Sequence, residues 1–153
     1  MRTLVLYIIY AIVVGELLSS CSTTKYVPDN QYLLDKVEIV SDGGQFKALE
    51  LRDYLHQRPN FKVFGLMKWQ LYVYNWSGRN ENRWVNKQLR RMGEPPVIMD
   101  TTLINQSEEE LKRFLVNKGY MNAEVTHSVD TSRQKKATVI YKISPNEPYR
   151  IQD

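Results

Sequence analysis

The chain has 153 residues, of which 25% are charged and 42% hydrophobic, a composition typical of globular proteins and not of disordered ones. Its net charge of +4 comes without a Lys/Arg block, a zinc-knuckle spacing or a helix-turn-helix pattern, which argues against a nucleic-acid partner. A weakly basic balance also fits proximity to an anionic membrane surface.

Residues 1–20 have the layout of a secretory signal peptide. One basic residue, Arg2, precedes an apolar run from Leu4 to Gly15. The run is too short for a membrane-spanning helix, which needs about 20 apolar residues. Glu16 interrupts it as well, so we interpret the segment as an export signal and not as a membrane span.

The signal ends in a sequence that resembles the bacterial lipobox: Leu18, Ser19 and Ser20 directly before Cys21. The resemblance implies cleavage before Cys21 and acylation of its thiol, which would anchor the mature chain in lipid. Ser22 stands where an inner-membrane retention signal usually has Asp, which favours the outer membrane. Cys21 is the one cysteine, so an intramolecular disulfide is excluded. The alternative is an ordinary signal peptide with an incidental cysteine.

The mature chain begins with a segment that we interpret as a lipidated tether, residues 21–35. Alternating apolar and polar residues then predict a short strand over Lys36–Val40, and the polar turn residues 41–44 end it. A helical stripe predicts a helix over Phe46–Gln57, stopped by Pro59.

An insertion of about residues 58–100 follows, and its structure is the hardest to predict. Its aromatic stretch, residues 66–76, fits a short helix or a short strand. A clearer amphipathic helix is predicted over Asn80–Met92, with Gly93 as its C-cap. One face of this helix carries Val85, Leu89 and Met92, and another carries Arg83, Lys87 and Arg90.

The most regular helix is predicted over Ser107–Lys118, where Ser107 and Glu110 have the spacing of a capping box. Gly119 stands where a left-handed residue ends a helix. Two alternating runs, 122–129 and 136–143, predict a β-hairpin. The order strand, helix, insertion, helix, strand, strand predicts an α+β fold with helices on one face of a sheet.

That order resembles the β-α-α-β-β order of the POTRA domain. The most specific likeness is the second helix with its Gly119-Tyr120 ending, followed by Ala123 and Val125. In that pattern Gly119 reverses the chain, Tyr120 plugs the corner, and Ala123 and Val125 face the helices. The resemblance implies a POTRA-like domain over residues 36–146, with a three-stranded mixed sheet whose last strand is central.

Further segments resemble the lipoprotein-type TamA relatives of Bacteroidetes, within the BamA/TamA superfamily: Thr24–Pro28, Tyr32–Leu34, Leu71–Asn75 and Gly93–Val97. Residues 143–151, with Asn146 as a turn residue, resemble the junction between consecutive POTRA domains. We therefore expect residues 147–153 to begin a following POTRA domain in a longer protein. The long insertion departs from a generic POTRA domain.

The resemblance implies a periplasmic module of an outer-membrane protein assembly or translocation factor that binds client or partner proteins. In the family's topology the second strand lies at a sheet edge, where an extended client could add a strand. The candidate edge residues are Asn122, Glu124, Thr126 and Ser128. Alternatively, Glu124 and His127 blunt this edge, or the insertion covers it.

Two other surfaces have both a functional and a structural interpretation. The aromatic stretch Trp69–Trp76 is either an exposed recognition patch or, more commonly, internal packing. Arg83, Lys87 and Arg90 either contact lipid headgroups or an acidic partner, or form an ordinary solvated face.

Nothing in the sequence indicates catalysis, a cofactor or a small-molecule substrate. His56 and His127 lie on separate elements without metal-ligand spacing, and the acidic run Glu108–Glu110 suits a helix start. The competing function is a small self-contained outer-membrane lipoprotein that acts as a scaffold or accessory subunit.

Overall fold

The computed structural model describes residues 23–44, 46–65 and 67–148, and the lipobox residues Leu18 to Cys21 lie outside them. The described residues form two compact units. The sheet unit comprises residues 27–60 and 97–148. The insertion unit comprises residues 23–26 and 61–96.

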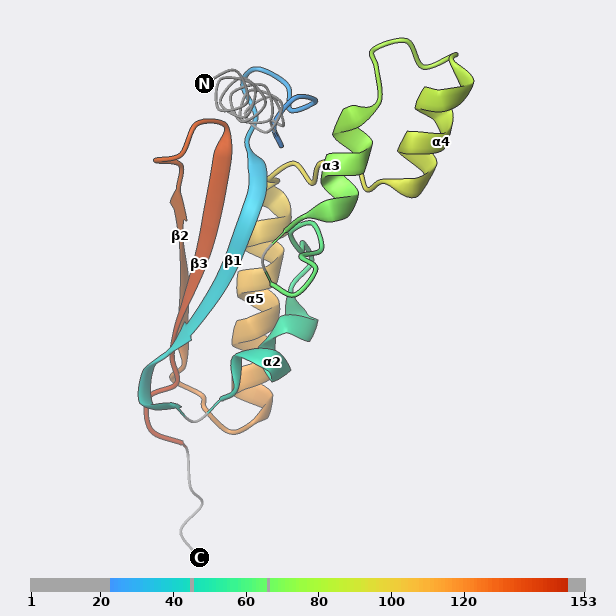
Figure 1. Cartoon of the computed structure of the whole chain (residues 1–153). Coiled ribbons are helices and arrows are strands. Elements are labelled where there is room, and N and C mark those ends of the chain that lie inside the picture. Colours follow the sequence, from blue (N-terminus) through green and yellow to red (C-terminus); the bar gives the residue numbers. More distant parts are fainter. Residues whose placement is uncertain (1–22, 45, 66, 149–153) are drawn as a thin grey trace, which may run out of the picture. The chain divides into compact units, whose positions relative to one another are not determined.

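Three strands form the sheet of the sheet unit in the order β1-β3-β2 (Figure 1). β1 (Leu33–Ser41) pairs in parallel with β3 (Lys136–Ser144), and β2 (Glu124–Asp130) pairs antiparallel with β3. The sheet is therefore mixed, and the last strand is central, as predicted. The predicted hairpin is also confirmed, because β2 and β3 are joined by the short polar turn after Asp130.

The core of the sheet unit lies between α5 (Thr101–Asn117) and one face of the sheet (Figure 1). Alternate residues of β3 are buried against the helix, because successive side chains of a strand point to opposite faces. The main buried side chains are Leu34, Leu51, Ile104, Leu111, Phe114, Leu115, Ala123, Val125, Val139, Tyr141 and Ile143. Ala123 and Val125 thus face the helices, as predicted.

β1 begins three residues earlier than predicted, at Leu33. An irregularity between Leu34 and Lys36 interrupts the pairing with β3. The alternation of apolar and polar side chains in the sequence is therefore regular only from Lys36 onward. Leu33 and Leu34 are both buried, because the segment Val97–Met99 pairs with the outer side of this end of β1.

The predicted capping box at Ser107 is wrong. α5 begins at Thr101, and the N-cap is Asp100, whose carboxylate accepts a hydrogen bond from the Thr102 N–H at 2.8 Å. Ser107 lies within the helix and is buried. Its hydroxyl donates a hydrogen bond to the carbonyl of Leu103 at 2.7 Å. The buried hydroxyl therefore has a hydrogen-bond partner within the helix.

The helix predicted over Phe46–Gln57 is shorter than expected. α2 (Ala48–Leu51) continues as one tight turn, η2 (Arg52–Tyr54), and the chain is extended at Leu55. The helix ends here because the next backbone N–H, that of His56, donates to the Ser107 hydroxyl at 2.9 Å.

The end of α5 follows the prediction. Gly119 has a φ of +94°, which places it in the left-handed region where glycine is favoured. Tyr120 then packs against the core, its ring centroid 5.2 Å from that of Phe46.

The insertion unit contains two helices, α3 (Trp69–Trp76) and α4 (Trp84–Met92), which pack on each other. The aromatic stretch is thus helical. Gly93 is the C-cap of α4 as predicted, although its backbone is extended rather than left-handed. A glycine is needed at this position because the backbone of Tyr74 lies close to it: a Cβ at residue 93 would lie 2.7 Å from the Tyr74 Cα.

The first described residues are part of the folded units and not a loose spacer. Thr23 and Val27 are buried. In the insertion unit, the Lys25 ammonium donates to the carbonyls of Asn75 and Ser77 at 2.8 and 3.0 Å, at the C-terminal end of α3. The Tyr26 hydroxyl donates to the Ser77 carbonyl at 2.5 Å, so these contacts fix residues 23–26 on α3.

Candidate partner-binding edge

β2 is a terminal strand of the sheet as far as the structure describes the chain. In an antiparallel pair, about half of the backbone N–H and C=O groups of a strand point away from the partner strand. These groups of β2 point away from β3 and form the free edge. The predicted residues Glu124, Thr126 and Ser128 are all exposed on β2, on the sheet face opposite α5.

Asn122 is exposed as well, but it lies before β2 and has a different role. Its carbonyl accepts a hydrogen bond from the Asn146 amide at 2.6 Å. Asn146 has a φ of +57°, which agrees with its predicted role as a turn residue. This contact fixes the start of β2 against the chain that leaves β3.

The opposite edge of the sheet is partly occupied. The Leu34 N–H donates to the Val97 carbonyl at 2.8 Å, and the Met99 N–H donates to the Tyr32 carbonyl at 2.9 Å. The apolar run Val97–Met99 is the sequence signal for this pairing, which was not predicted. β2 is therefore the less obstructed edge for a further strand among the described residues.

The charges of β2 are concentrated at its two ends. Glu124 begins the strand and Asp130 ends it, whereas Thr126 and Ser128 between them are neutral. Two hydrogen bonds from Ser132, of which the backbone N–H bond is the larger influence, lower the pKa of Asp130 from its ordinary value, so this carboxylate stays charged. Such end charges discourage pairing with a long flat strand but leave the neutral centre open.

His127 does not blunt the edge, because its ring belongs to the opposite face of the sheet. It is half-buried, and its Nδ1 pairs with the carboxylate of Glu108 on α5. The second histidine, His56, lies 3.7 Å from Glu110 through its Nε2. Each histidine thus lies beside a different acid of α5, and the contact of His127 with Glu108 joins β2 to this helix.

The basic residues predicted on α4 do not form one surface. Lys87 and the N-cap residue Arg83 are exposed. Arg90 instead turns into the insertion unit, where it pairs with Glu81, donates to the Ser77 hydroxyl at 3.2 Å, and lies 5.4 Å from the Tyr26 ring. Its role among the described residues is therefore mainly structural.

The aromatic stretch is divided between packing and exposure. Leu71 and Val73 are buried, whereas Trp69 and Trp76 are half-exposed with their rings edge to face at 5.9 Å. The apolar face predicted for α4 is mostly exposed: Val85 and Met92 are exposed, Leu89 is half-buried, and the buried residue of the helix is Asn86.

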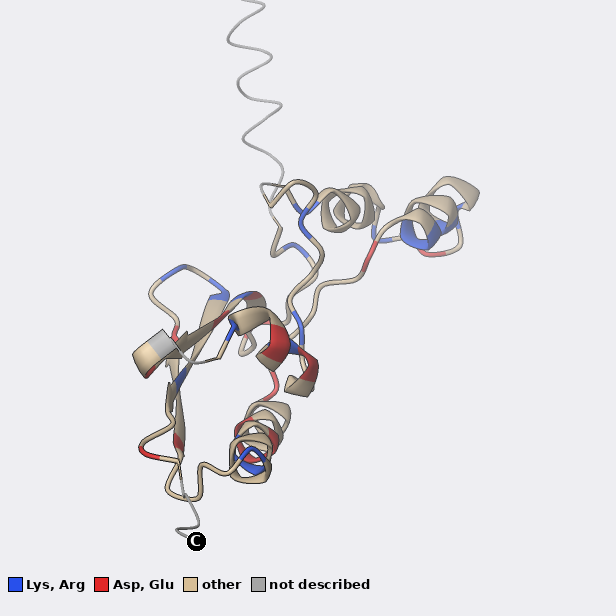
Figure 2. Cartoon of the chain, turned by 90° about the horizontal axis from the view of Figure 1, so that it is seen from below, with Lys and Arg blue, Asp and Glu red and all other residues tan. Residues whose placement is uncertain are grey.

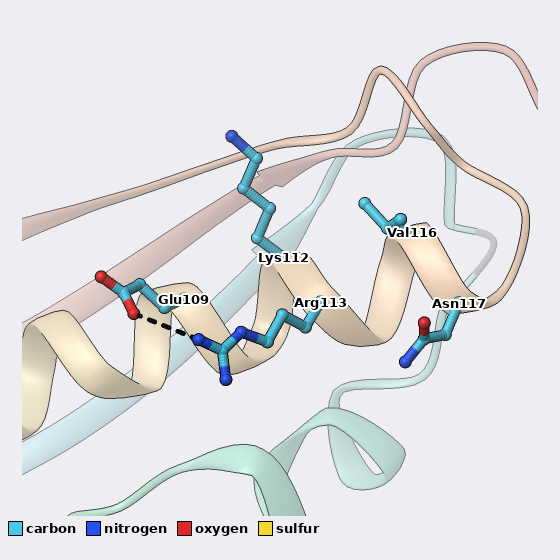
Figure 3. Close-up of a pocket in the computed structure, with 5 residues that line it drawn as sticks. All are labelled: Glu109, Lys112, Arg113, Val116 and Asn117. Atoms are coloured by element: carbon cyan, nitrogen blue, oxygen red, sulfur yellow. Dashed lines mark ion pairs between the residues drawn. The ribbon is translucent and has the colours of Figure 1, made fainter.

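Other surface features do not assemble a chemical site. A shallow hollow on α5 is lined by five side chains of that one helix, including the Glu109–Arg113 ion pair at 3.8 Å (Figure 3). In the described ranges, His, Cys, Asp and Glu side chains do not gather in threes as a metal site requires. The same ranges contain no helix with the length and apolarity for a membrane span.

Comparison with known families gives one match that covers most of the chain. The POTRA family model, described as surface antigen variable number repeat, matches residues 32–146. No curated protein and no solved structure matches the chain. The matched range runs from the start of β1 to the turn after β3, and it includes β2 and the whole insertion.

Proposed function

Because the chain belongs to the POTRA family, we propose that it is the N-terminal periplasmic module of an outer-membrane protein assembly or translocation factor, and that it binds client proteins along β2. POTRA domains are in general periplasmic modules of such factors and act by binding partner proteins. They are interaction modules and not catalysts. The proposal therefore concerns recognition of an extended chain.

The observation that carries this proposal is the position of β2 at the edge of the sheet, with a neutral centre at Thr126 and Ser128. An added strand would bind through main-chain hydrogen bonds, which do not depend on the client's side chains. Unfolded outer-membrane proteins differ in sequence but share strand-forming segments. Backbone pairing at β2 would therefore suit a protein that handles many of them.

The proposed location is supported by the lipobox-like sequence before Cys21, which favours a lipid anchor in the outer membrane. An anchored domain facing the periplasm would meet clients as they reach the membrane. We further propose that the chain belongs to the lipoprotein-type TamA relatives of Bacteroidetes. The support for this narrower assignment is the set of sequence segments that includes Tyr32–Leu34 and Leu71–Asn75.

Site-specific photo-cross-linking tests the proposal. The full chain carries a photoreactive amino acid at Thr126 on β2, and a matched variant carries it at Arg113, which is also exposed, on α5. Each is mixed with a labelled outer-membrane β-barrel protein diluted out of urea. We expect a cross-link from position 126 and little from position 113, because position 126 lies on an edge strand and position 113 lies on a helix.

Equal cross-linking at both positions, or none at position 126, would contradict binding along β2. The same variants in native membranes separate the two functions considered above. Position 126 should capture several outer-membrane proteins in an assembly factor. A single partner in fixed stoichiometry would instead support a scaffold or accessory lipoprotein.

A further inference from the structure

The insertion unit exposes large apolar side chains that its own core does not use. All three tryptophans of the chain lie in it, and Trp69, Trp76 and Trp84 are 50%, 56% and 72% exposed. The other large apolar side chains that it exposes are Phe61, Phe64, Met67, Val85 and Met92. Exposed apolar side chains of this size, where they adjoin one another as Trp69 and Trp76 do, are typical of an interaction surface.

In α4 the buried residue is polar and several apolar residues are exposed. Its buried residue is Asn86, whose amide oxygen accepts from the Gly78 N–H at 2.9 Å and whose amide nitrogen donates to the Asn80 carbonyl at 2.6 Å. Its exposed residues are of apolar and basic types: Trp84, Val85, Lys87, Arg91 and Met92. The outward face of this helix is therefore both apolar and cationic.

The charge of the insertion unit is strongly positive. Residues 23–26 and 61–96 contain eight Lys or Arg residues and two Glu residues, a net charge of +6. The sheet unit, residues 27–60 and 97–148, contains eleven basic and thirteen acidic residues. In Figure 2 basic residues mark α4, whereas α5 carries both signs. The basic excess of the protein thus belongs to the insertion unit.

The anchor point is close to this unit along the chain. Cys21 precedes Lys25 by four residues, which span at most about 14 Å when fully extended. Lys25 is fixed by its two hydrogen bonds to the C-terminal end of α3. If Cys21 is acylated, the insertion unit cannot lie far from the lipid surface.

We propose that the insertion unit docks on the anionic phospholipid surface beside the anchor, with its exposed tryptophans at the headgroup level and the basic residues of α4 against phosphates. Tryptophan suits this depth because its ring is apolar and its N–H is polar. Basic residues near an anionic surface add electrostatic attraction. The inference rests on the proposed lipid anchor, and it assigns to the insertion a role separate from client binding at β2.

Tryptophan fluorescence tests the docking, because all three tryptophans report on the insertion unit alone. The acylated full chain is reconstituted into vesicles of phosphatidylethanolamine and phosphatidylglycerol with brominated acyl chains. We expect strong quenching and a shift of emission to shorter wavelength relative to unbrominated vesicles. In phosphatidylcholine vesicles, which lack the negative charge, the quenching should be weaker.

A charge-reversed pair supplies the matched control. The double variant Arg83→Glu, Lys87→Glu should lose most of the quenching, because both residues are exposed at the start of α4. The double variant Lys112→Glu, Arg113→Glu makes the same change on the exposed face of α5 and should retain it. Equal loss in both variants would overturn the role assigned to α4.

Flotation of the same vesicles separates the failure of this inference from the failure of its premise. The chain should float with the vesicles, and its Cys21→Ser variant should not remain lipid-anchored. A floating chain with unquenched tryptophans would overturn docking while the anchor stands, and would leave the aromatic residues to a protein partner. A chain that carries no acyl group and does not float would overturn both the anchor and the docking.

Discussion

The hydroxyl of Ser107 is a small polar group inside the apolar stripe of α5, and it accepts the hydrogen bond of the His56 N–H. We predict that Ser107→Ala destabilises the protein by about 1–2 kcal/mol, because it leaves a partly buried donor without an acceptor. The measurement is urea unfolding. Ser128→Ala, on the exposed face of β2, should change the free energy of unfolding by less than about 0.5 kcal/mol. Similar losses in both variants would contradict this role of Ser107.

Tyr141 makes the stability of the protein depend on alkaline pH. Burial raises the pKa of its phenol above the ordinary 10.0, and the nearby Ser107 hydroxyl lowers it by less. The folded protein therefore holds the phenol proton more tightly than the unfolded chain does. The resulting stability is complete below pH 10 and is lost as the pH rises through the raised pKa of the folded state.

We predict that Tyr141→Phe reduces the loss of melting temperature above pH 10, since phenylalanine has no proton to lose. Melting curves of both proteins from neutral to alkaline pH give the comparison, and the difference between them removes the contribution of the other tyrosines. Parallel declines would show that Tyr141 does not carry the alkaline sensitivity.

At the scale of elements, the packing of α3 on α4 depends on Gly93. An added Cβ would overlap the backbone of Tyr74, so we predict that Gly93→Ala destabilises the insertion unit by about 1–3 kcal/mol. Near-ultraviolet circular dichroism should show it, because all three tryptophans lie in this unit. Gly119→Ala should cost about 1 kcal/mol through its left-handed backbone and leave the tryptophan signal unchanged. An unchanged tryptophan spectrum in Gly93→Ala would contradict the close approach.

Elements whose side chains alternate or repeat without interruption could be predicted from the sequence. β2 and β3 follow this rule, and so does the end of α5 at Gly119, because local chemistry determines each of them. The start of α5 could not be predicted, because Ser107 and Glu110 have the spacing of a capping box although the N-cap is Asp100. The start of β1 was also missed, because an irregular pairing and the cover of Val97–Met99 replace simple alternation.

Which face of α4 is buried could not be predicted from the sequence either. Its apolar residues have helical spacing, which ordinarily indicates a face buried in the core. Here the hydrogen bonds of Asn86 and the contacts of Arg90 turn the polar residues inward, and Val85 and Met92 are exposed. Periodicity identifies a helix, but it does not say which face the rest of the protein covers. The membrane-docking proposal accounts for the exposed apolar residues of this helix.

For the whole molecule, the two units suggest a division of roles. The sheet unit has nearly balanced charge and has β2 at an edge of its sheet, and the insertion unit has a net charge of +6 and exposed tryptophans. A lipid anchor at Cys21 would attach the chain next to the insertion unit. The two proposals involve different residues, those of the insertion unit and those of β2. A variant on α4 should therefore leave client binding at β2 intact.

Amide hydrogen exchange of the full chain, with and without an unfolded outer-membrane β-barrel protein, tests the central claim most directly. If the client adds a strand to β2, alternate amides of Glu124–Asp130 should exchange more slowly, because those facing β3 are already bonded and those facing outward gain partners. The amides of α5 should not change. Unchanged exchange in β2, or protection confined to the insertion unit, would contradict binding along this edge.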